Sequence, residues 1–253
     1  MAQSYKHTTL IDSRDVDLRG QCRASALMGH MQEAATQAAE TGGFGRHVLM
    51  ERHHGFWMLT RMWYRLERPL NWGEELTIHT WHRGAKGVVS YRDYDLYVGE
   101  ELVGEGVSAW VLADAESHKL LRLNGVTEMA DTHGGLLCKE KNLSKLKSPE
   151  GVKTLEKRIM RYSDTDINGH VNNTRYADFA CDALRMDKLP EDYYLAEMQI
   201  GYLAECRAGE VLDILSGESA DGRTYICGND EEGKSRFEGM LLFRKVEKEN
   251  NHV

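Results

Sequence analysis

The sequence predicts an α+β fold made of two similar domains in tandem, each with one long helix packed against an antiparallel β-sheet. Two observations predict it. The segment Asp15–Gln21 can be laid over Asp164–His170 at a spacing of 149 residues, and the two copies share both aspartates and the glycine. After each copy, a helical pattern is followed by a series of strand-like segments, which is the element order of an α+β domain.

Both copies of the repeated segment lead into a predicted helix of about sixteen residues. Apolar residues recur there three or four positions apart, so each helix has one apolar face that must be buried. These apolar positions are Leu27, Met31, Ala34, Ala35 and Ala38 in the first helix, and Tyr176, Phe179, Ala180, Ala183 and Leu184 in the second.

The elements that follow the helices are predicted strands, because apolar and polar residues alternate between turns such as Val98-Gly99-Glu100. Gly73–Ile78 resembles Gly209–Ile214 at a shorter spacing of 136 residues, so the second half is the more compact. The predicted strands are 56–68, 75–83, 87–98, 101–114, 193–206, 210–219, 222–228 and 235–245.

The boundary between the domains is expected where periodicity is lost, between residues of about 125 and 156. We therefore place an N-terminal domain at 1–130, a linker at 131–156 and a C-terminal domain at 157–253. The linker region is also the one clearly basic stretch, because Lys139–Arg161 contains eight Lys or Arg and three Glu, a balance of +5.

The composition of the 253 residues excludes several classes of protein. A net charge of −8 argues against nonspecific nucleic-acid binding, and no segment approaches the ~20 apolar residues of a membrane span. The five cysteines include no Cys-x-x-Cys pair, which argues against a disulfide framework or a structural zinc site. Because the start of the chain also lacks a secretory pattern, we expect a cytoplasmic protein with neither nucleic acid nor membrane as a partner.

Two other short patterns give no site. His53-His54 lacks metal-ligand spacing, and the glycines of Gly42-Gly43-Phe44-Gly45 lack the strand–loop–helix context of a phosphate-binding loop. Neither a metal nor a dinucleotide is therefore expected.

The second copy of the repeat differs from the first where chemistry could reside. It has Asn168 and His170 where the first copy has Arg19 and Gln21, so only the second retains an acid-base set together with Asp166. A carboxylate, an amide and an imidazole just before a helix would favour developing negative charge. An ordinary turn and helix cap would use the same residue types, and spacing alone leaves both interpretations open.

Glu205 and Cys206 end a predicted strand of the same half of the chain. Taken alone, they are more simply explained as a solvated carboxylate and a buried, inert thiol.

Taken together, these residues resemble a known family, the acyl-[acyl carrier protein] thioesterases of plants and bacteria. Ser163–Asn173 is similar to that family's Asp-x-Asn-x-His-Val-Asn-Asn signature, and Tyr202–Cys206 to its Glu-Cys pair. The order of weaker matches in the first half extends the resemblance from about Tyr5 to Arg244: Met28–Ala34, Leu59–Met62, Trp72-Gly73 and Ser108–Val111. The start of the chain does not resemble the transit peptide of the plant members, so a bacterial-type member is expected.

The resemblance implies two tandem hotdog domains and hydrolysis of fatty acyl-[acyl carrier protein], which releases the fatty acid and ends chain elongation in fatty-acid synthesis. It implies that the catalytic residues are Asp166, Asn168, His170 and Glu205, with Cys206 as a position of less settled role. Acyl carrier protein is then the expected partner, no cofactor or metal is needed, and the N-terminal domain binds the acyl chain. A homodimer remains open, although a tandem pair already mimics a dimer.

A thioester carbonyl is reactive, so hydrolysis needs chiefly a positioned water, a base and an oxyanion partner. Our hypothesis makes Glu205 the base and Asn168 the group that polarises the carbonyl, with His170, oriented by Asp166, protonating the thiolate. In the competing hypothesis Cys206 is the nucleophile and His170 its base.

The sequence leaves other functions and other interpretations of these residues open. Hotdog folds also host acyl-CoA thioesterases and enoyl hydratases, and a noncatalytic acyl-binding protein would use the polar set as a cap. Met28, Met31 and Trp57 could line an acyl channel but are more simply core residues. The basic stretch Lys139–Arg161 could dock an acidic carrier protein, or be a solvated linker.

Overall fold

The computed structural model describes residues 4–123 and 141–246. Its contacts divide the chain into two compact units, and two short segments from the first half of the chain belong to the second unit. Unit 1 comprises Met1–Leu10, Leu27–Tyr64 and Glu75–Lys145, and unit 2 comprises Ile11–Ala26, Arg65–Glu74 and Leu146–Val253. The first copy of the repeated segment therefore belongs to unit 2, although it comes early in the chain.

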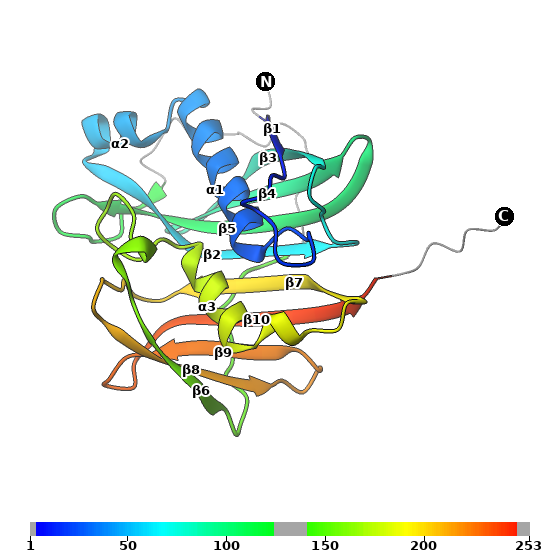
Figure 1. The fold of residues 1–253 in the computed structure, drawn as a ribbon. Helices are drawn as coiled ribbons and strands as arrows, with labels where there is room; N and C mark the ends of the chain where they lie inside the picture. Colours follow the sequence, from blue (N-terminus) through cyan, green and yellow to red (C-terminus); the bar gives the residue numbers. More distant parts are fainter. Residues whose placement is uncertain (1–3, 124–140, 247–253) are drawn as a thin grey trace. The chain divides into compact units, whose positions relative to one another are not determined.

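Unit 1 is a curved antiparallel sheet with a long helix on one face (Figure 1). Its strands follow the order β1-β3-β4-β5-β2, and the pairs β1–β3, β3–β4 and β4–β5 are antiparallel. Most of helix α1 belongs to this unit, and a short helix α2 follows it. The elements are β1 (Ser4–Leu10), α1 (Ala24–Thr41), α2 (Arg46–His53), β2 (Gly55–Leu66), β3 (Glu75–Lys86), β4 (Val89–Val98) and β5 (Glu101–Asp114).

Unit 2 repeats this plan with shorter elements. Its strands follow the order β7-β10-β9-β8-β6, and helix α3 lies on one face of the sheet (Figure 1). The elements are β6 (Lys153–Ile159), the 3-10 turn η3 (Tyr162–Asp164), α3 (Arg175–Ala183), the 3-10 turn η4 (Met186–Lys188), β7 (Tyr193–Tyr202), β8 (Val211–Glu218), β9 (Thr224–Asn229) and β10 (Ser235–Lys245).

Each helix is held by a close fit to the sheet beneath it. In unit 1, fully buried Met31 of α1 covers Gly106 of β5, where an added Cβ would collide with the Met31 side chain. In unit 2, Tyr176 of α3 packs against Phe237 of β10, with ring centroids 5.1 Å apart. Burial of such faces provides most of the stability of an amphipathic helix, whose intrinsic helical propensity is weak.

The predicted α+β class, with a helix packed on an antiparallel sheet in each half, is confirmed. One of the two predicted helices is shorter than the expected sixteen residues, and one further helix was not predicted. Helix α3 has nine residues, because the chain enters the left-handed region at Arg185 with a φ of 56°. Helix α2 has no clear signal in the sequence, since Leu49 is its one buried residue and its other positions are mostly polar. In the part of the chain that the structure describes, no helix combines the length and apolar character needed to cross a membrane.

Candidate active site

The second copy of the repeat forms a tight, internally bonded loop between η3 and α3. The Asp166 N–H donates to the His170 carbonyl at 2.9 Å, and the Asp166 carboxylate accepts from the Asn168 N–H at 2.8 Å. Gly169 takes a φ of 77°, a conformation that glycine adopts without steric cost. The loop therefore presents Asn168 and His170 from a fixed backbone.

The first copy has the same backbone hydrogen bonds, which supports the duplication. The Asp17 N–H donates to the Gln21 carbonyl at 2.8 Å, and the Asp17 carboxylate accepts from the Arg19 N–H at 2.8 Å. Gly20 has a φ of 74°, close to that of Gly169. The two loops therefore share a backbone design and differ in the side chains that they present.

The second loop is fastened to the segment that carries Glu205. The Val171 N–H donates to the Cys206 carbonyl at 2.8 Å, and the guanidinium of Arg236 donates to the Glu205 carbonyl at 2.9 Å. As a result, His170 Nε2 lies 3.1 Å from Glu205 Oε2, with the two side chains 20% and 42% exposed. An imidazole and a carboxylate from distant parts of the sequence thus form one acid-base pair at the surface of unit 2.

Asp166 holds the loop through its own side chain. Within residues 4–123 and 141–246, its carboxylate accepts from the Asn168 N–H, and Glu205 is the carboxylate that pairs with the His170 ring. An aspartate that bonds to the backbone N–H two residues further on forms an Asx-turn. Asp166 therefore stabilises the loop that carries Asn168 and His170.

Arg207 is a neighbour of the pair that the sequence did not suggest. Its guanidinium lies 3.4 Å from His170 Nε2, the same nitrogen that faces Glu205. With a proton on Nε2 the ring donates to Glu205, and with the proton on Nδ1 it accepts from Arg207. His170 Nε2 therefore has one anionic neighbour, Glu205, and one cationic neighbour, Arg207.

Cys206 is directed away from this surface. It is 0% exposed, whereas Glu205 before it and Arg207 after it are exposed. Burial raises the pKa of the Cys206 thiol, and a hydrogen bond with the Tyr176 side chain offsets part of that rise. A buried neutral thiol is a poor nucleophile, since the thiolate is the reactive form.

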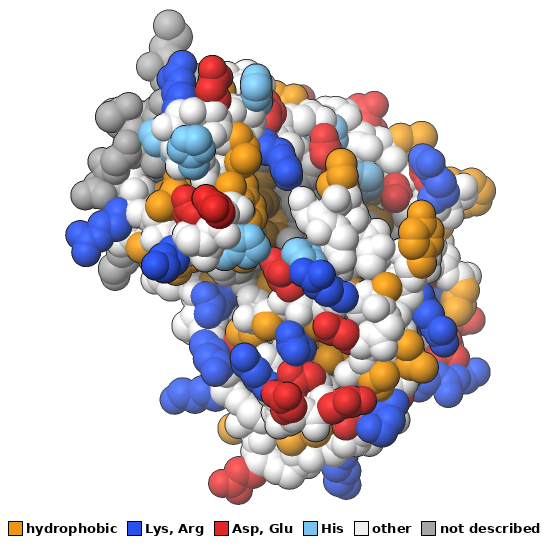
Figure 2. Space-filling model, turned by 90° about the vertical axis from the view of Figure 1, so that its left-hand side faces the viewer, with side chains coloured by type: hydrophobic (Ala, Val, Ile, Leu, Met, Phe, Trp, Pro, Cys, Tyr) orange, Lys and Arg blue, Asp and Glu red, His pale blue; other side chains and the backbone are white. Residues whose placement is uncertain are grey.

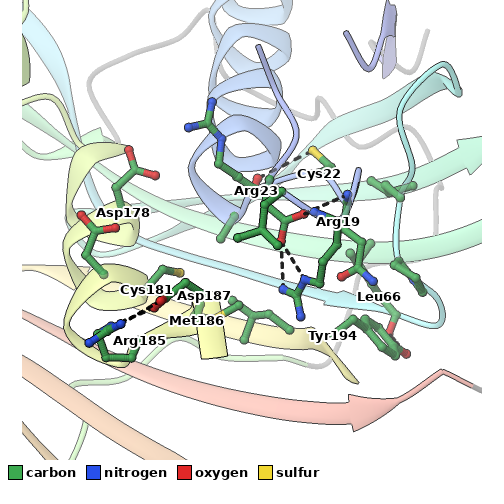
Figure 3. Close-up of a pocket in the computed structure, with 18 of the residues that line it drawn as sticks. Arg19, Cys22, Arg23, Leu66, Asp178, Cys181, Arg185, Met186, Asp187 and Tyr194 are labelled. Atoms are coloured by element: carbon green, nitrogen blue, oxygen red, sulfur yellow. Dashed lines mark hydrogen bonds and ion pairs between the residues drawn. The ribbon is translucent and has the colours of Figure 1, made fainter. Parts of the chain in front are cut away.

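The first loop lines a cavity of about 490 Å³ within unit 2, together with side chains of α3, η4 and β7 (Figure 3). Arg19 stands there at the position equivalent to Asn168, bonded to Asp17 at 2.9 Å and to the Tyr193 carbonyl at 3.3 Å. The Cys22 N–H donates to the Leu70 carbonyl at 2.7 Å, as Val171 does to Cys206, which makes Pro69 the counterpart of Glu205. The first copy therefore lacks a counterpart of the Glu205 carboxylate, as well as counterparts of the Asn168 amide and the His170 imidazole.

Unit 1 contains a second cavity, of about 230 Å³, between α1, the start of β2 and strands β3 to β5. Trp57 is part of its wall and donates to the Phe44 carbonyl at 3.1 Å. Met28 and Met31 are fully buried, and the cavity lining does not include them, which favours the interpretation that both are core residues.

The basic stretch is only partly described, because Lys139 and Glu140 lie outside the described residues. Lys157 and Arg158 are paired with Asp213 and Asp182, each at 2.8 Å. Lys and Arg side chains on the face in Figure 2 are interspersed with Asp and Glu. The cations of this stretch that are exposed are Lys145, Lys147, Lys153, Lys157 and Arg161. No group of three or more His, Cys, Asp or Glu suited to a metal ion occurs in the described ranges.

Comparison with protein families gives two matches that divide the chain between them. Residues 2–128 match the model of the acyl-ACP thioesterase N-terminal domain, and residues 148–246 match that of the acyl-ACP thioesterase C-terminal domain.

Curated relatives are distant in sequence. An oleoyl-acyl carrier protein thioesterase of chloroplasts from Coriandrum sativum is 23% identical over 88% of this chain, and a dodecanoyl-[acyl-carrier-protein] hydrolase from Cinnamomum camphora is 26% identical over 84%. The chain spans 65% and 59% of the length of these two proteins.

Solved structures share the fold along nearly the whole chain. An acyl-ACP thioesterase from Bacteroides thetaiotaomicron has a TM-score of 0.88 at 21% identity, covering 96% of this chain and 98% of its own. A 12:0-ACP thioesterase from Umbellularia californica has a TM-score of 0.77 at 23% identity, covering 97% and 98%. At these identities the similarity establishes the double hotdog fold and not the substrate.

Proposed function

Because the chain belongs to the acyl-ACP thioesterase family, we propose that it hydrolyses the thioester of fatty acyl-[acyl carrier protein] and releases the free fatty acid. The observation that carries the proposal is the contact of 3.1 Å between His170 Nε2 and Glu205 Oε2. It joins the two functional segments that the family signature predicts, and it leaves both side chains accessible to a substrate.

The proposed reaction uses water as the nucleophile. Glu205 accepts one proton from the water as its oxygen bonds to the carbonyl carbon, while the side-chain amide of Asn168 stabilises the oxyanion. As the carbon–sulfur bond breaks, the imidazolium form of His170 gives a proton to the thiolate and becomes a neutral imidazole, and the proton on Glu205 then passes to this imidazole across the 3.1 Å contact. The charge of the protein is therefore the same before and after a turnover.

This arrangement assigns different roles to the other residues of the motif. Asp166 keeps the Asn168 backbone in place through the 2.8 Å bond to its N–H. Cys206 acts as a packing residue under α3, because its buried thiol with a raised pKa is unsuited to attack. The apolar wall of the unit 1 cavity binds the acyl chain, a role for which Trp57 provides contact area.

We propose that the carrier protein docks on exposed Lys and Arg side chains near the site. Arg161 follows strand β6, whose end is bonded to the turn after Arg207 through Met160 and Glu210 at 2.8 Å. Arg161 and Arg207 are both exposed, so they can meet an acidic partner or a phosphate group. Such docking is electrostatic and weakens as salt screens it. The reaction would then take place in the cytoplasm, where fatty acyl chains are elongated on the carrier.

The test is a comparison of three substrate classes with the purified protein. Saturated acyl-carrier thioesters should release free thiol, acyl-CoA of equal chain length should react more slowly, and enoyl-CoA should keep its absorbance. Raising the ionic strength should lower kcat/KM for the carrier substrate more than for acyl-CoA. Hydration of enoyl-CoA without thiol release would assign a hydratase instead, and binding without turnover an acyl-binding protein.

A further inference from the structure

The cavity of unit 1 has two chemically different walls. One wall is apolar and aromatic, formed by Ala39, Phe44, Phe56 and Trp57. The other is formed by polar side chains of the sheet that are buried or partly buried, among them His82, Ser90, Arg92 and Trp110. A cavity for a plain hydrocarbon needs only the first of these walls.

Arg92 is the unusual member of the polar wall. It lies in the middle of β4, opposite His82 of β3 and Ser108 of β5, and it is 5% exposed. Arginine is rarely buried to this extent without a paired carboxylate, because removing the guanidinium from water is costly. Burial accordingly lowers the pKa of Arg92.

The surroundings of Arg92 offset only part of the cost of its burial, through electrostatic interaction with Tyr94 and Asp93. Among the described residues, its hydrogen bond is one of 3.4 Å to the Thr80 hydroxyl. The adjacent carboxylate of Asp93 is engaged by Arg83, whose Nε lies 2.9 Å from Asp93 Oδ1. A guanidinium has five N–H donors, so several of those of Arg92 are available to whatever occupies the cavity.

The groups beside Arg92 have defined partners. His82 Nε2 and Ser90 Oγ are 2.8 Å apart, and the Trp110 Nε1–H donates to Ser108 Oγ at 2.6 Å. These bonds fix the polar wall around the guanidinium. A saturated chain filling the cavity would remove the remaining water from Arg92 and replace it with nothing, whereas a chain with an oxygen there would supply an acceptor.

We propose that the unit 1 cavity selects acyl chains that carry an oxygen function away from the thioester, a hydroxyl, oxo or carboxylate group, and that Arg92 is the residue that recognises this oxygen. The inference rests on the proposed function, because it concerns the acyl group whose thioester the protein cleaves. Phe44, Phe56 and Trp57 contact the hydrocarbon part, and the Arg92 guanidinium donates to the oxygen.

The test compares thioesters that differ only at the end of the chain, over a series of chain lengths. Each length is offered with a terminal methyl, hydroxyl or carboxylate, and kcat/KM is measured for the wild type, Arg92→Met and Arg52→Met. Arg92→Met keeps a similar length without the charge, and exchange of a buried charge for an apolar side chain is commonly tolerated by the fold. Arg52 is the matched control, because it is an exposed arginine of α2 that does not line the cavity.

At one or more chain lengths, the wild type should favour an oxygenated chain over the methyl chain by about 10-fold or more, the range for a hydrogen bond to a charged group. Arg92→Met should bring that ratio to about one or below, and Arg52→Met should leave it unchanged. A wild-type ratio of one or less at every length would overturn the inference. So would an Arg92→Met ratio equal to that of the wild type.

A binding measurement separates this inference from the proposed function. Non-hydrolysable thioether analogues of the same chains are added to the wild type and to Arg92→Met, and the thermal unfolding midpoint is followed. The oxygenated analogue should raise the midpoint of the wild type more than that of Arg92→Met, even if no thioester is cleaved. Equal shifts in the two proteins would refute the role of Arg92, whereas absence of thiol release would refute only the hydrolysis.

Discussion

Replacing Glu205 by glutamine isolates the proposed base with little change in volume. The amide can still bond to His170 across the 3.1 Å contact, but it cannot accept a proton from water. A positioned general base contributes roughly 10² to 10⁴ in rate, or about 3 to 5 kcal/mol of the barrier. We therefore expect Glu205→Gln to lose at least about 10²-fold in kcat, with KM nearly unchanged.

The structure also predicts that this loss is not caused by unfolding. Because the Glu205 side chain is 42% exposed, its pairing with His170 should contribute about 0 to 1 kcal/mol to the free energy of unfolding. Urea denaturation of Glu205→Gln should thus nearly coincide with that of the wild type. Glu210→Gln is the matched control, since Glu210 lies in the same connection between β7 and β8, and its replacement should leave kcat within about 3-fold if the loss is specific to the base.

The assay is the initial rate of thiol release from a saturated acyl-carrier thioester at saturating concentration. A loss of less than about 10-fold in Glu205→Gln would refute the assignment of Glu205 as the base, given the usual magnitude of that effect. An equal loss in Glu210→Gln would show that the effect comes from the negative charge of this connection and not from a base at Glu205.

The remaining predictions concern neighbouring groups. Asn168→Asp should lower kcat by about 10² to 10³, because it replaces an oxyanion donor with an anion, and a loss below about 10-fold would exclude that role. Cys206→Ala should keep kcat within about 10-fold of the wild type, and the wild-type Cys206 should resist iodoacetamide at neutral pH, since its buried thiol is neutral. Because burial raises the pKa of Cys206, the unfolded chain loses this proton first as pH rises. The free energy of unfolding should therefore fall above about pH 8.5, by up to about 1.4 kcal/mol per pH unit for this group, and urea titrations of Cys206→Ala should show the shallower slope. Gly106→Ala should lower the free energy of unfolding by about 1 to 3 kcal/mol, because the new methyl group would meet Met31, and an unchanged urea midpoint would contradict that fit.

The fold was predictable from local patterns where burial is continuous. The strand 101–114 was placed correctly because a mostly buried run of residues lies between clear turns. The early end of α3 was not predictable, since Arg185 takes the left-handed conformation without the glycine that normally signals it. The helix α2 was missed because few of its residues are buried.

The sequence named candidate residues for the site but not their geometry. The repeat and the family signature pointed to Asn168 and His170, but the approach of His170 to Glu205 depends on the bond between Val171 and Cys206, which joins distant segments. Corresponding strands of the two halves are 136 residues apart in the sequence. This spacing places Pro69 opposite Glu205, so the absence of the carboxylate in the first copy could have been predicted. Nothing in the sequence indicated that the side chain of Arg207 reaches His170.

The central claim is that water attacks the thioester directly at the His170–Glu205 pair. Its most direct test is a single-turnover reaction with an acyl-carrier thioester, in which free thiol, free fatty acid and the intact mass of the protein are followed together. If water attacks directly, thiol and fatty acid appear at the same rate while the protein keeps its mass. Thiol released ahead of the acid, with the acyl group added to the mass of the protein, would contradict it.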